Sequence, residues 1–203
     1  MKVVIVDYKM GNVRSVLRSF EKFTNDVTIS ADPQDLKTAT HIVLPGVGSF
    51  ADGMKNLEES GVIPTLIEEV TKNKIPFLGI CLGMQLLASV GYEGGKKNGL
   101  NLISGHVRKL IPTEKEPVPH VGWNEIHKKF DHPILHEIND GTDFYFVHGY
   151  HFLPDDKNNI ISITPYLGEV VSIVADGNII GMQFHPEKSQ ISGFKIIKNF
   201  LEL

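Results

Sequence analysis

The sequence contains one cysteine, Cys81, among its 203 residues. A lone cysteine excludes an intrachain disulfide framework and is typical of a reducing compartment, so we expect a cytoplasmic protein. No run of about 18 apolar residues is present, and we therefore expect no membrane span. The N-terminal apolar run meets an acid at Asp7, too early for the apolar core of a signal peptide.

The chain also lacks an excess of positive charge. Its formal net charge is −4, and no basic stripe with interleaved aromatic residues is present, which disfavours nucleic-acid binding. Hydrophobic residues make up 41% and charged residues 22%, as in ordinary globular proteins. Without internal repeats or low-complexity linkers, the length predicts one domain over residues 1–203.

The first half alternates apolar strand-like runs with helical patterns. Val3–Val6 is a continuous β-branched run, typical of a buried parallel strand. Further strands are predicted over Val27–Ser30, Ile42–Leu44 and Ile75–Ile80, with helices over Val13–Phe20 and over 51–72, the latter interrupted near Gly61 and Pro64. This alternation predicts a parallel sheet covered by helices.

The second half has a different pattern. Strands are predicted over Phe144–Phe152 and Ile160–Thr164, and Asp176–Asn178 predicts a hairpin turn between Val170–Ala175 and Ile179–Phe184. A closing helix is expected over Gly193–Leu201, and residues 91–116 are expected to form loop and short strand. We therefore expect an α/β fold, with a mostly parallel central sheet flanked by helices and an antiparallel extension in the second half.

Cys81 lies where a strand-like run ends and a helical pattern begins, in Phe77–Gln85 (FLGICLGMQ). Glycines two residues to either side, Gly79 and Gly83, give the thiol counterpart of a serine nucleophile elbow. The following helix would direct free N–H groups and its positive end at the sulfur, which favours the reactive thiolate. The alternative is that Cys81 is a small buried hydrophobic residue.

A cysteine nucleophile needs a base, and the base needs an orienting group. His185 follows a predicted strand in Gln183–Lys188 (QFHPEK), and an extended His-Pro-Glu segment would place His185 and Glu187 on the same side. A carboxylate there can fix the tautomer of the imidazole and stabilise the imidazolium. The alternative is an ordinary histidine at a strand end, followed by a solvated acid.

Acyl transfer also needs hydrogen-bond donors for an oxyanion. The backbone N–H of Leu82 is one candidate, and the loop Pro45–Gly48 (PGVG) is another, because glycines allow close backbone approach. The loop could equally be a plain turn that ends a strand. His148 and His151 are loosely spaced and lack further ligands, so we expect neither a metal nor a cofactor.

Together, Pro45–Phe50 (PGVGSF), Gly79–Gln85 (GICLGMQ) and Gln183–Ser189 (QFHPEKS) resemble the class I, or triad, glutamine amidotransferases. The order and approximate spacing also match that family. More narrowly, the chain resembles the glutaminase subunits of imidazole glycerol phosphate synthases in three further segments, Asp7–Ser15, Pro119–Asn124 and Tyr145–His148. The resemblance covers essentially the whole chain.

The resemblance implies a mechanism and a set of site residues. Cys81 would attack the side-chain amide of glutamine, with His185, oriented by Glu187, as proton donor and then base. Oxyanion and substrate contacts would come from Val47, Gly48, Leu82, Gln85, Tyr145, His148, Gly149 and Tyr150.

A partner subunit is also implied. The ammonia would pass through a channel to a (β/α)₈-barrel synthase subunit in a heterodimer, which makes imidazole glycerol phosphate and an aminoimidazole carboxamide ribotide for histidine biosynthesis. Interface residues would include Trp123, Asn124, Tyr145 and Lys188.

The sequence departs from the subfamily at three places. Lys9 replaces a usual glycine, Gly149 replaces a usual serine or threonine, and residues 164–169 depart from the usual pattern. Three alternatives stay open at this point. The chain could serve an ATP-dependent sugar amidotransferase of surface-glycan biosynthesis, it could be a catalytically silent scaffold, or it could be a free-standing hydrolase such as a γ-glutamyl peptidase.

Overall fold

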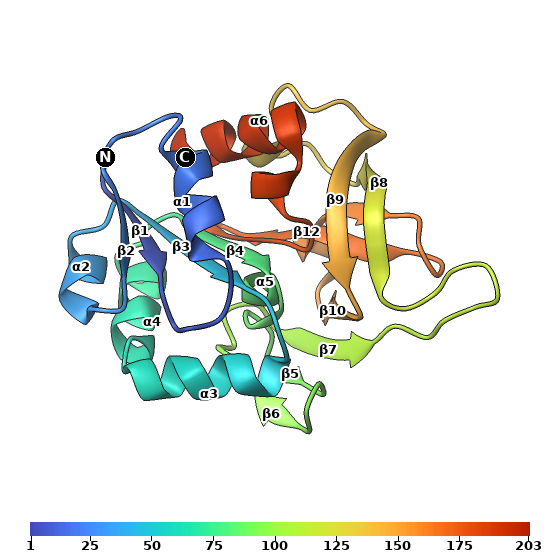
Figure 1. Cartoon of the computed structure of the whole chain (residues 1–203), viewed down its shortest axis with the longest axis horizontal. Helices are drawn as coiled ribbons and strands as arrows, with labels where there is room; N and C mark the ends of the chain where they lie inside the picture. Colours follow the sequence, from blue (N-terminus) through green and yellow to red (C-terminus); the bar gives the residue numbers. More distant parts are fainter.

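A nine-stranded sheet forms the centre of the computed structural model, which describes residues 1–203 (Figure 1). In spatial order the sheet contains β2 (Val27–Ser30), β1 (Val3–Val6), β3 (His41–Gly46), β4 (Phe77–Cys81), β13 (Ile179–Met182), β12 (Val170–Asp176), β11 (Ile160–Thr164), β8 (His120–Lys128) and β9 (Thr142–His148). The strands from β2 to β13 are parallel, and those from β13 to β9 pair antiparallel. The predicted fold class is confirmed.

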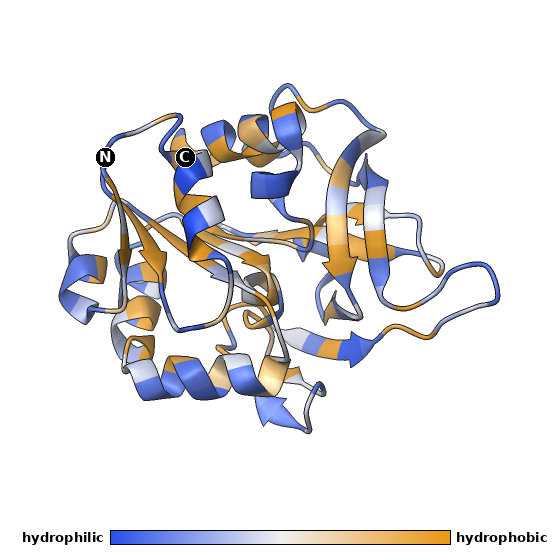
Figure 2. Ribbon diagram, viewed as in Figure 1, coloured by the Kyte–Doolittle hydropathy of each residue, from blue (hydrophilic) through white to orange (hydrophobic).

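Helices cover both faces of the parallel part (Figure 1). One face carries α1 (Val13–Phe20) and α6 (Gln190–Leu201), and the other carries α2 (Pro33–Lys37), α3 (Phe50–Ser60), α4 (Ile63–Thr71) and the short α5 (Leu82–Gln85). Because strand side chains alternate, Val4 and Val6 pack under α2–α5, whereas Val3 and Ile5 pack under α1 and α6. The apolar strands lie between these more polar helices (Figure 2).

The interruption predicted near Gly61 and Pro64 separates α3 from α4. The Ser49 hydroxyl caps α3 by accepting from the N–H of Asp52 at 3.2 Å. Gly61 follows with φ +74°, a left-handed conformation that glycine adopts at little cost. Pro64 lies in the first turn of α4, where its missing N–H leaves no hydrogen bond unmade.

A second, four-stranded sheet contains β10 (Tyr150–Pro154), β7 (Gly105–Lys109), β5 (Val90–Gly91) and β6 (Lys97–Asn98). The prediction of one strand over Phe144–Phe152 was therefore wrong. The chain leaves the large sheet after His148, and at Tyr150 it pairs with Lys109 of the small sheet. Three short 3₁₀ segments complete the chain, η1 (Pro133–Leu135), η2 (Lys157–Asn159) and η3 (Pro186–Lys188).

Three adjacent parallel strands end at the same edge of the large sheet. Gly46 at the end of β3 pairs with Cys81 at the end of β4, and Ile80 pairs with Met182 at the end of β13. The carboxyl edge of an open α/β sheet is where such folds bind ligands. The loop after β3, the cysteine and the His185 segment therefore meet in one place. No helix of the structure has the length and apolar character needed to cross a bilayer.

Candidate active site

Cys81 stands on a strained turn. Its φ of 54° and ψ of −107° are unusual for a residue with a side chain, as at a nucleophile elbow. A Cβ atom on Gly79 would lie 2.6 Å from the carbonyl oxygen of Gly83, so the strand and the following turn touch backbone to backbone. The predicted helix after Cys81 is only the single turn of α5, and the helix dipole expected there is correspondingly small.

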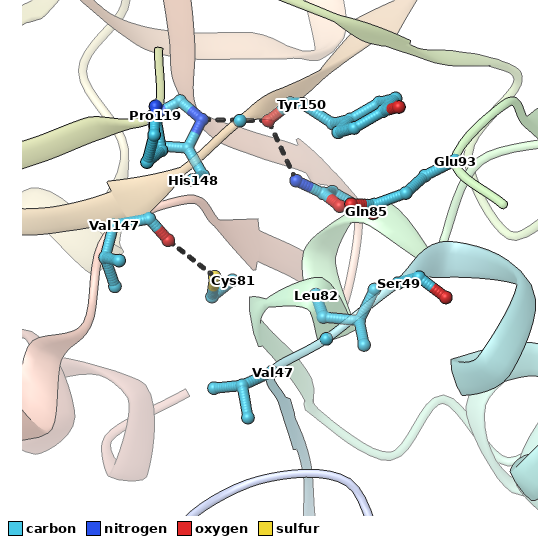
Figure 3. Close-up of a pocket in the computed structure, with 12 residues that line it drawn as sticks. Val47, Ser49, Cys81, Leu82, Gln85, Glu93, Pro119, Val147, His148 and Tyr150 are labelled. Atoms are coloured by element: carbon cyan, nitrogen blue, oxygen red, sulfur yellow. Dashed lines mark hydrogen bonds between the residues drawn. The ribbon is translucent and has the colours of Figure 1, made fainter.

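The Cys81 side chain is buried and lines a pocket (Figure 3). Its thiol lies 3.7 Å from the carbonyl oxygen of Val147, and the Gln183 side-chain amide approaches the sulfur at 3.7 Å. The Oε1 atom of Gln183 in turn accepts from Gln85 Nε2 at 3.1 Å. Gln183 thus contacts both the sulfur and Gln85, a role that nothing in the sequence pattern singled out.

His185 and Glu187 are brought together as the sequence predicted. The Nδ1 atom of His185 lies 2.8 Å from Oε1 of Glu187, and both side chains are about 4% exposed. The cause differs from the prediction, because the segment is not extended throughout. His185 is extended, but Pro186 begins the 3₁₀ turn η3, and that turn brings Glu187 back to the imidazole.

Opposing effects set the protonation of His185. Burial lowers the pKa of the imidazole, but the neighbouring Cys81 and Glu187 raise it more, to about 10. The Nδ1 atom bonds Glu187, whereas Nε2 is buried without a hydrogen-bond partner. Nε2 can therefore carry a proton toward a group that reacts at Cys81.

Strand β9 fixes the backbone of His185. The His185 N–H donates to the carbonyl of Tyr145 at 2.9 Å. The Ser189 hydroxyl donates to the His185 carbonyl at 2.7 Å and accepts from the Tyr145 N–H at 3.0 Å. Tyr145, expected among the substrate contacts, lies outside the pocket and instead holds the histidine through its backbone.

A pocket of about 390 Å³ opens beside Cys81 (Figure 3). Except for Tyr145, all the oxyanion and substrate residues expected from the sequence line it. The complete lining is Val47, Gly48, Ser49, Cys81, Leu82, Gln85, Glu93, Pro119, Val147, His148, Gly149 and Tyr150.

Glu93 is the one acidic side chain of this lining, and sequence reasoning missed it. Its Oε2 atom accepts from the Phe50 N–H at 3.1 Å. Burial and, less strongly, Asp52 raise the pKa of Glu93, whereas the Phe50 hydrogen bond lowers it. No sequence signal marked Glu93, because it lies in a glycine- and lysine-rich segment that predicts only loop and short strand.

The loop after β3 has a conformation that only glycine adopts readily. Gly48 has φ +110°, and a Cβ atom there would lie 2.8 Å from the Cε atom of Met10. Val47 is half exposed, and both residues line the pocket together with Leu82. Their backbone therefore borders the same pocket as Cys81.

Three of the four expected interface residues form one surface cluster. Trp123 is 48% exposed and its ring centroid lies 6.1 Å from that of Tyr145. The ammonium of Lys188 lies 5.6 Å from the Tyr145 ring centroid. Asn124 has a different role, since its Nδ2 atom approaches His120 Nε2 at 3.3 Å and the Pro165 carbonyl at 3.5 Å.

No group of three His, Cys, Asp or Glu side chains is arranged so that it could hold a metal ion, and this includes His148 and His151. His148 is instead hydrogen-bonded to His120.

Comparison with known proteins gives consistent matches. Residues 4–203 match the family model described as glutamine amidotransferase class-I. The chain is 44% identical to the imidazole glycerol phosphate synthase subunit HisH of Geobacter sulfurreducens, over 100% of this chain and 99% of that protein. It is 42% identical to the HisH subunit of Moorella thermoacetica, over 99% of this chain and 94% of the relative.

Solved structures of low sequence identity share the fold. A glutamine amidotransferase from Thermotoga maritima superposes with a TM-score of 0.65 at 21% identity, covering 100% of this chain and 83% of that chain. The PurLQS structure from Thermotoga maritima gives a TM-score of 0.72 at 17% identity, covering 99% and 97%.

Proposed function

Because the chain belongs to the class I glutamine amidotransferase family, we propose that it is the glutaminase subunit of an imidazole glycerol phosphate synthase. The observation that carries the chemistry is a buried His185–Glu187 pair, 2.8 Å apart, beside a cysteine on a strained turn that opens into a pocket. The full-length relatives named as subunits of that synthase support the particular assembly.

The first half of the reaction uses the protonated His185. The Cys81 thiolate attacks the amide carbon of glutamine, and the carbonyl oxygen becomes an oxyanion. The backbone N–H of Leu82 and the loop at Val47 and Gly48 supply donors for this charge. His185 gives its Nε2 proton to the amide nitrogen, the carbon–nitrogen bond breaks, and ammonia leaves a glutamyl thioester on Cys81.

The second half uses the same histidine in its neutral form. Once the sulfur is acylated, the negative charge that helped hold the proton on His185 is gone. His185 then takes a proton from water as the water oxygen attacks the thioester carbon. The carbon–sulfur bond breaks, glutamate leaves, and the thiolate and imidazolium are restored.

Glu93 provides the charge that selects the amino-acid end of glutamine. A carboxylate that lines the same pocket as Cys81 pairs favourably with the α-ammonium of the substrate. The pocket volume of about 390 Å³ lies within the range of small-molecule sites. The Gln85 side chain donates hydrogen bonds to the Tyr150 carbonyl and to Gln183 Oε1. These bonds give the pocket wall at Gln85 a fixed shape.

The cluster of Trp123, Tyr145 and Lys188 is where the synthase subunit would dock. It presents the exposed indole of Trp123 beside the ring of Tyr145, and both residue types are enriched in protein interfaces. The cluster adjoins His185 through the Tyr145 backbone. A partner bound there, a (β/α)₈ barrel in a cytoplasmic heterodimer, could receive ammonia before it reaches solvent.

Product formation by the assembled heterodimer tests the proposal. The chain is purified with the barrel subunit from the same cell and supplied with the phosphoribosyl-aminoimidazole carboxamide intermediate. Glutamine should support imidazole glycerol phosphate formation with the chain present, and an ammonium salt should support it without the chain. If glutamine yields glutamate but no imidazole product, a different ammonia acceptor is indicated, and with no glutamate at all the glutaminase assignment fails.

A further inference from the structure

We propose that His120 is a positioning residue of the glutamine pocket, which it orders through a one-way chain of hydrogen bonds with His148. The chain of bonds runs from Asn124 on β8 through both imidazoles to the carbonyl of Tyr150. The inference rests on the proposed function, because it concerns the pocket where glutamine would bind.

The direction of the chain follows from its last acceptor. His148 Nδ1 lies 2.8 Å from the carbonyl oxygen of Tyr150, which can only accept, so Nδ1 carries the proton. In a neutral imidazole the other nitrogen is then an acceptor. His148 Nε2 lies 3.0 Å from His120 Nδ1, which must therefore be the donor in that pair.

The roles of His120 and Asn124 follow in the same way. With its proton on Nδ1, a neutral His120 has an accepting Nε2, which lies 3.3 Å from Asn124 Nδ2. The Asn124 amide is oriented independently, because its Oδ1 atom accepts from the Glu125 N–H at 2.9 Å. Every bond in the chain therefore has one possible direction, and both histidines carry the Nδ1–H tautomer.

Packing holds the His120 ring in place and out of contact with water. His120 is 3% exposed and lies between the rings of Phe146 and Tyr166, at centroid distances of 4.8 Å and 3.8 Å. The Tyr166 hydroxyl is tied to the carbonyl of Pro117.

Burial also favours the neutral form of both imidazoles. Burial lowers the pKa of His148 to about 3, with smaller contributions from His120, His151 and His185, although the bond to Tyr150 opposes the shift. Burial also lowers the pKa of His120 to about 4, against a smaller raising effect of Glu116. Both rings are therefore neutral at physiological pH.

The chain ends on an atom that shapes the pocket. The Tyr150 carbonyl accepts from His148 Nδ1 and also from Gln85 Nε2 at 3.0 Å (Figure 3). Without the donor of His120, the accepting nitrogen of His148 is buried and unpaired, and a shift to the Nε2–H tautomer would break its bond to Tyr150. Loss of His120 would thus loosen the wall formed by Gln85, Gly149 and Tyr150.

Nitrogen NMR on the protein labelled with ¹⁵N-histidine tests the direction of these hydrogen bonds. We expect both His120 and His148 as neutral Nδ1–H tautomers, with a scalar coupling between His120 Nδ1 and His148 Nε2. Free histidine favours the Nε2–H tautomer, so a purely steric stack would not produce this signature. An Nε2–H tautomer or an imidazolium on either ring would overturn the proposal, whether or not the chain proves to be a glutaminase.

Kinetics test the positioning role. His120→Leu in the assembled enzyme should raise the KM for glutamine about fivefold, the factor typical of one lost neutral hydrogen bond, with a much smaller change in kcat. His120→Asn retains an amide N–H near the Nδ1 position, so its KM should lie closer to wild type than that of the leucine variant.

His127→Leu, on the same strand but outside the chain of bonds, is the matched control and should behave as wild type. A leucine variant with an unchanged KM, or an asparagine variant as impaired as leucine, would contradict the proposal. If the leucine variant does not fold, the NMR signature of the wild type still decides. A wild-type enzyme without glutaminase activity would contradict the proposed function and not the hydrogen-bond directions.

Discussion

Gly83 packs against the main chain of Leu44, so that a Cβ atom at Gly83 would lie 1.7 Å from the Leu44 carbonyl oxygen. No real Cβ atom comes so close to an oxygen. The contact joins the turn after Cys81 to β3, the strand that leads into the loop at Val47 and Gly48. A glycine at this position therefore allows the turn after Cys81 to pack directly against β3.

Gly83→Ala should consequently destabilise the fold by at least about 2 kcal/mol, because the backbone of the turn after Cys81 and that of β3 have to move apart. Urea unfolding of the purified chain measures this difference. Gly149→Ser is the matched control, since a Cβ atom there meets Val118 Cγ1 at an ordinary 3.5 Å. Its unfolding free energy should stay within about 0.5 kcal/mol of wild type, and equal effects of the two substitutions would contradict the packing argument.

Lys9 adopts φ +64°, where the subfamily usually has glycine. A left-handed conformation costs a residue with a Cβ atom about 1–2 kcal/mol, and glycine avoids this cost. Part of the stability gained by a change to glycine is lost again, because glycine has a larger conformational entropy in the unfolded chain. Lys9→Gly should therefore raise the free energy of unfolding by up to about 1 kcal/mol in a urea titration. Lys9→Ala keeps the strain and serves as control, and an equal gain from alanine would show that backbone conformation is not the cause.

Replacing Glu187 by glutamine removes a charge 2.8 Å from the His185 imidazole. The pKa of His185, raised to about 10 in the folded protein by Cys81 and Glu187 against burial, should fall in this variant, as followed by NMR titration. An unchanged pKa would show that Glu187 does not hold the proton on His185.

The same shift has a consequence for stability. The folded-state pKa of about 10 exceeds the unfolded value of about 6.5, so protonated His185 stabilises the fold fully below pH about 6.5. That contribution is lost as the pH rises through about 10. Wild type should therefore lose more unfolding free energy than Glu187→Gln over this interval, and parallel curves would contradict the assignment.

Glu93→Gln should weaken glutamine binding through the loss of a charged hydrogen bond to the α-ammonium. Such a bond is worth about 1.5–3 kcal/mol, so the KM for glutamine should rise roughly 10- to 100-fold, with a smaller effect on kcat. Glu58→Gln, at a surface ion pair with Lys97, is the control and should leave KM unchanged. A KM for Glu93→Gln equal to that of the control would remove Glu93 from substrate recognition.

The parallel half of the fold was predictable because its signals are local. Val3–Val6 is β-branched throughout, and Gly79 and Gly83 bracket Cys81 closely enough to mark a strained turn. His185 and Glu187 were identified together because only Pro186 separates them in the chain. Each of these patterns lies within one short segment of the sequence.

Features that depend on distant pairing were not predictable. Strand β8 contains Gly122 and polar residues without a clean alternation, and its pairing with β9 and β11 makes it a strand. The end of β9 before Gly149 likewise depends on a distant strand, because β7 pairs with the chain from Tyr150 onward. Glu93 enters the pocket from a loop whose composition indicates only that it is exposed.

Glutamate release from glutamine by the chain assembled with the proposed barrel partner tests the central claim most directly. The wild-type complex should release glutamate, whereas Cys81→Ala should release none while keeping wild-type circular dichroism and partner binding. The alanine variant keeps the fold because it removes only one sulfur atom from the turn. A wild-type complex that releases no glutamate, or an alanine variant that releases as much as wild type, would contradict the account.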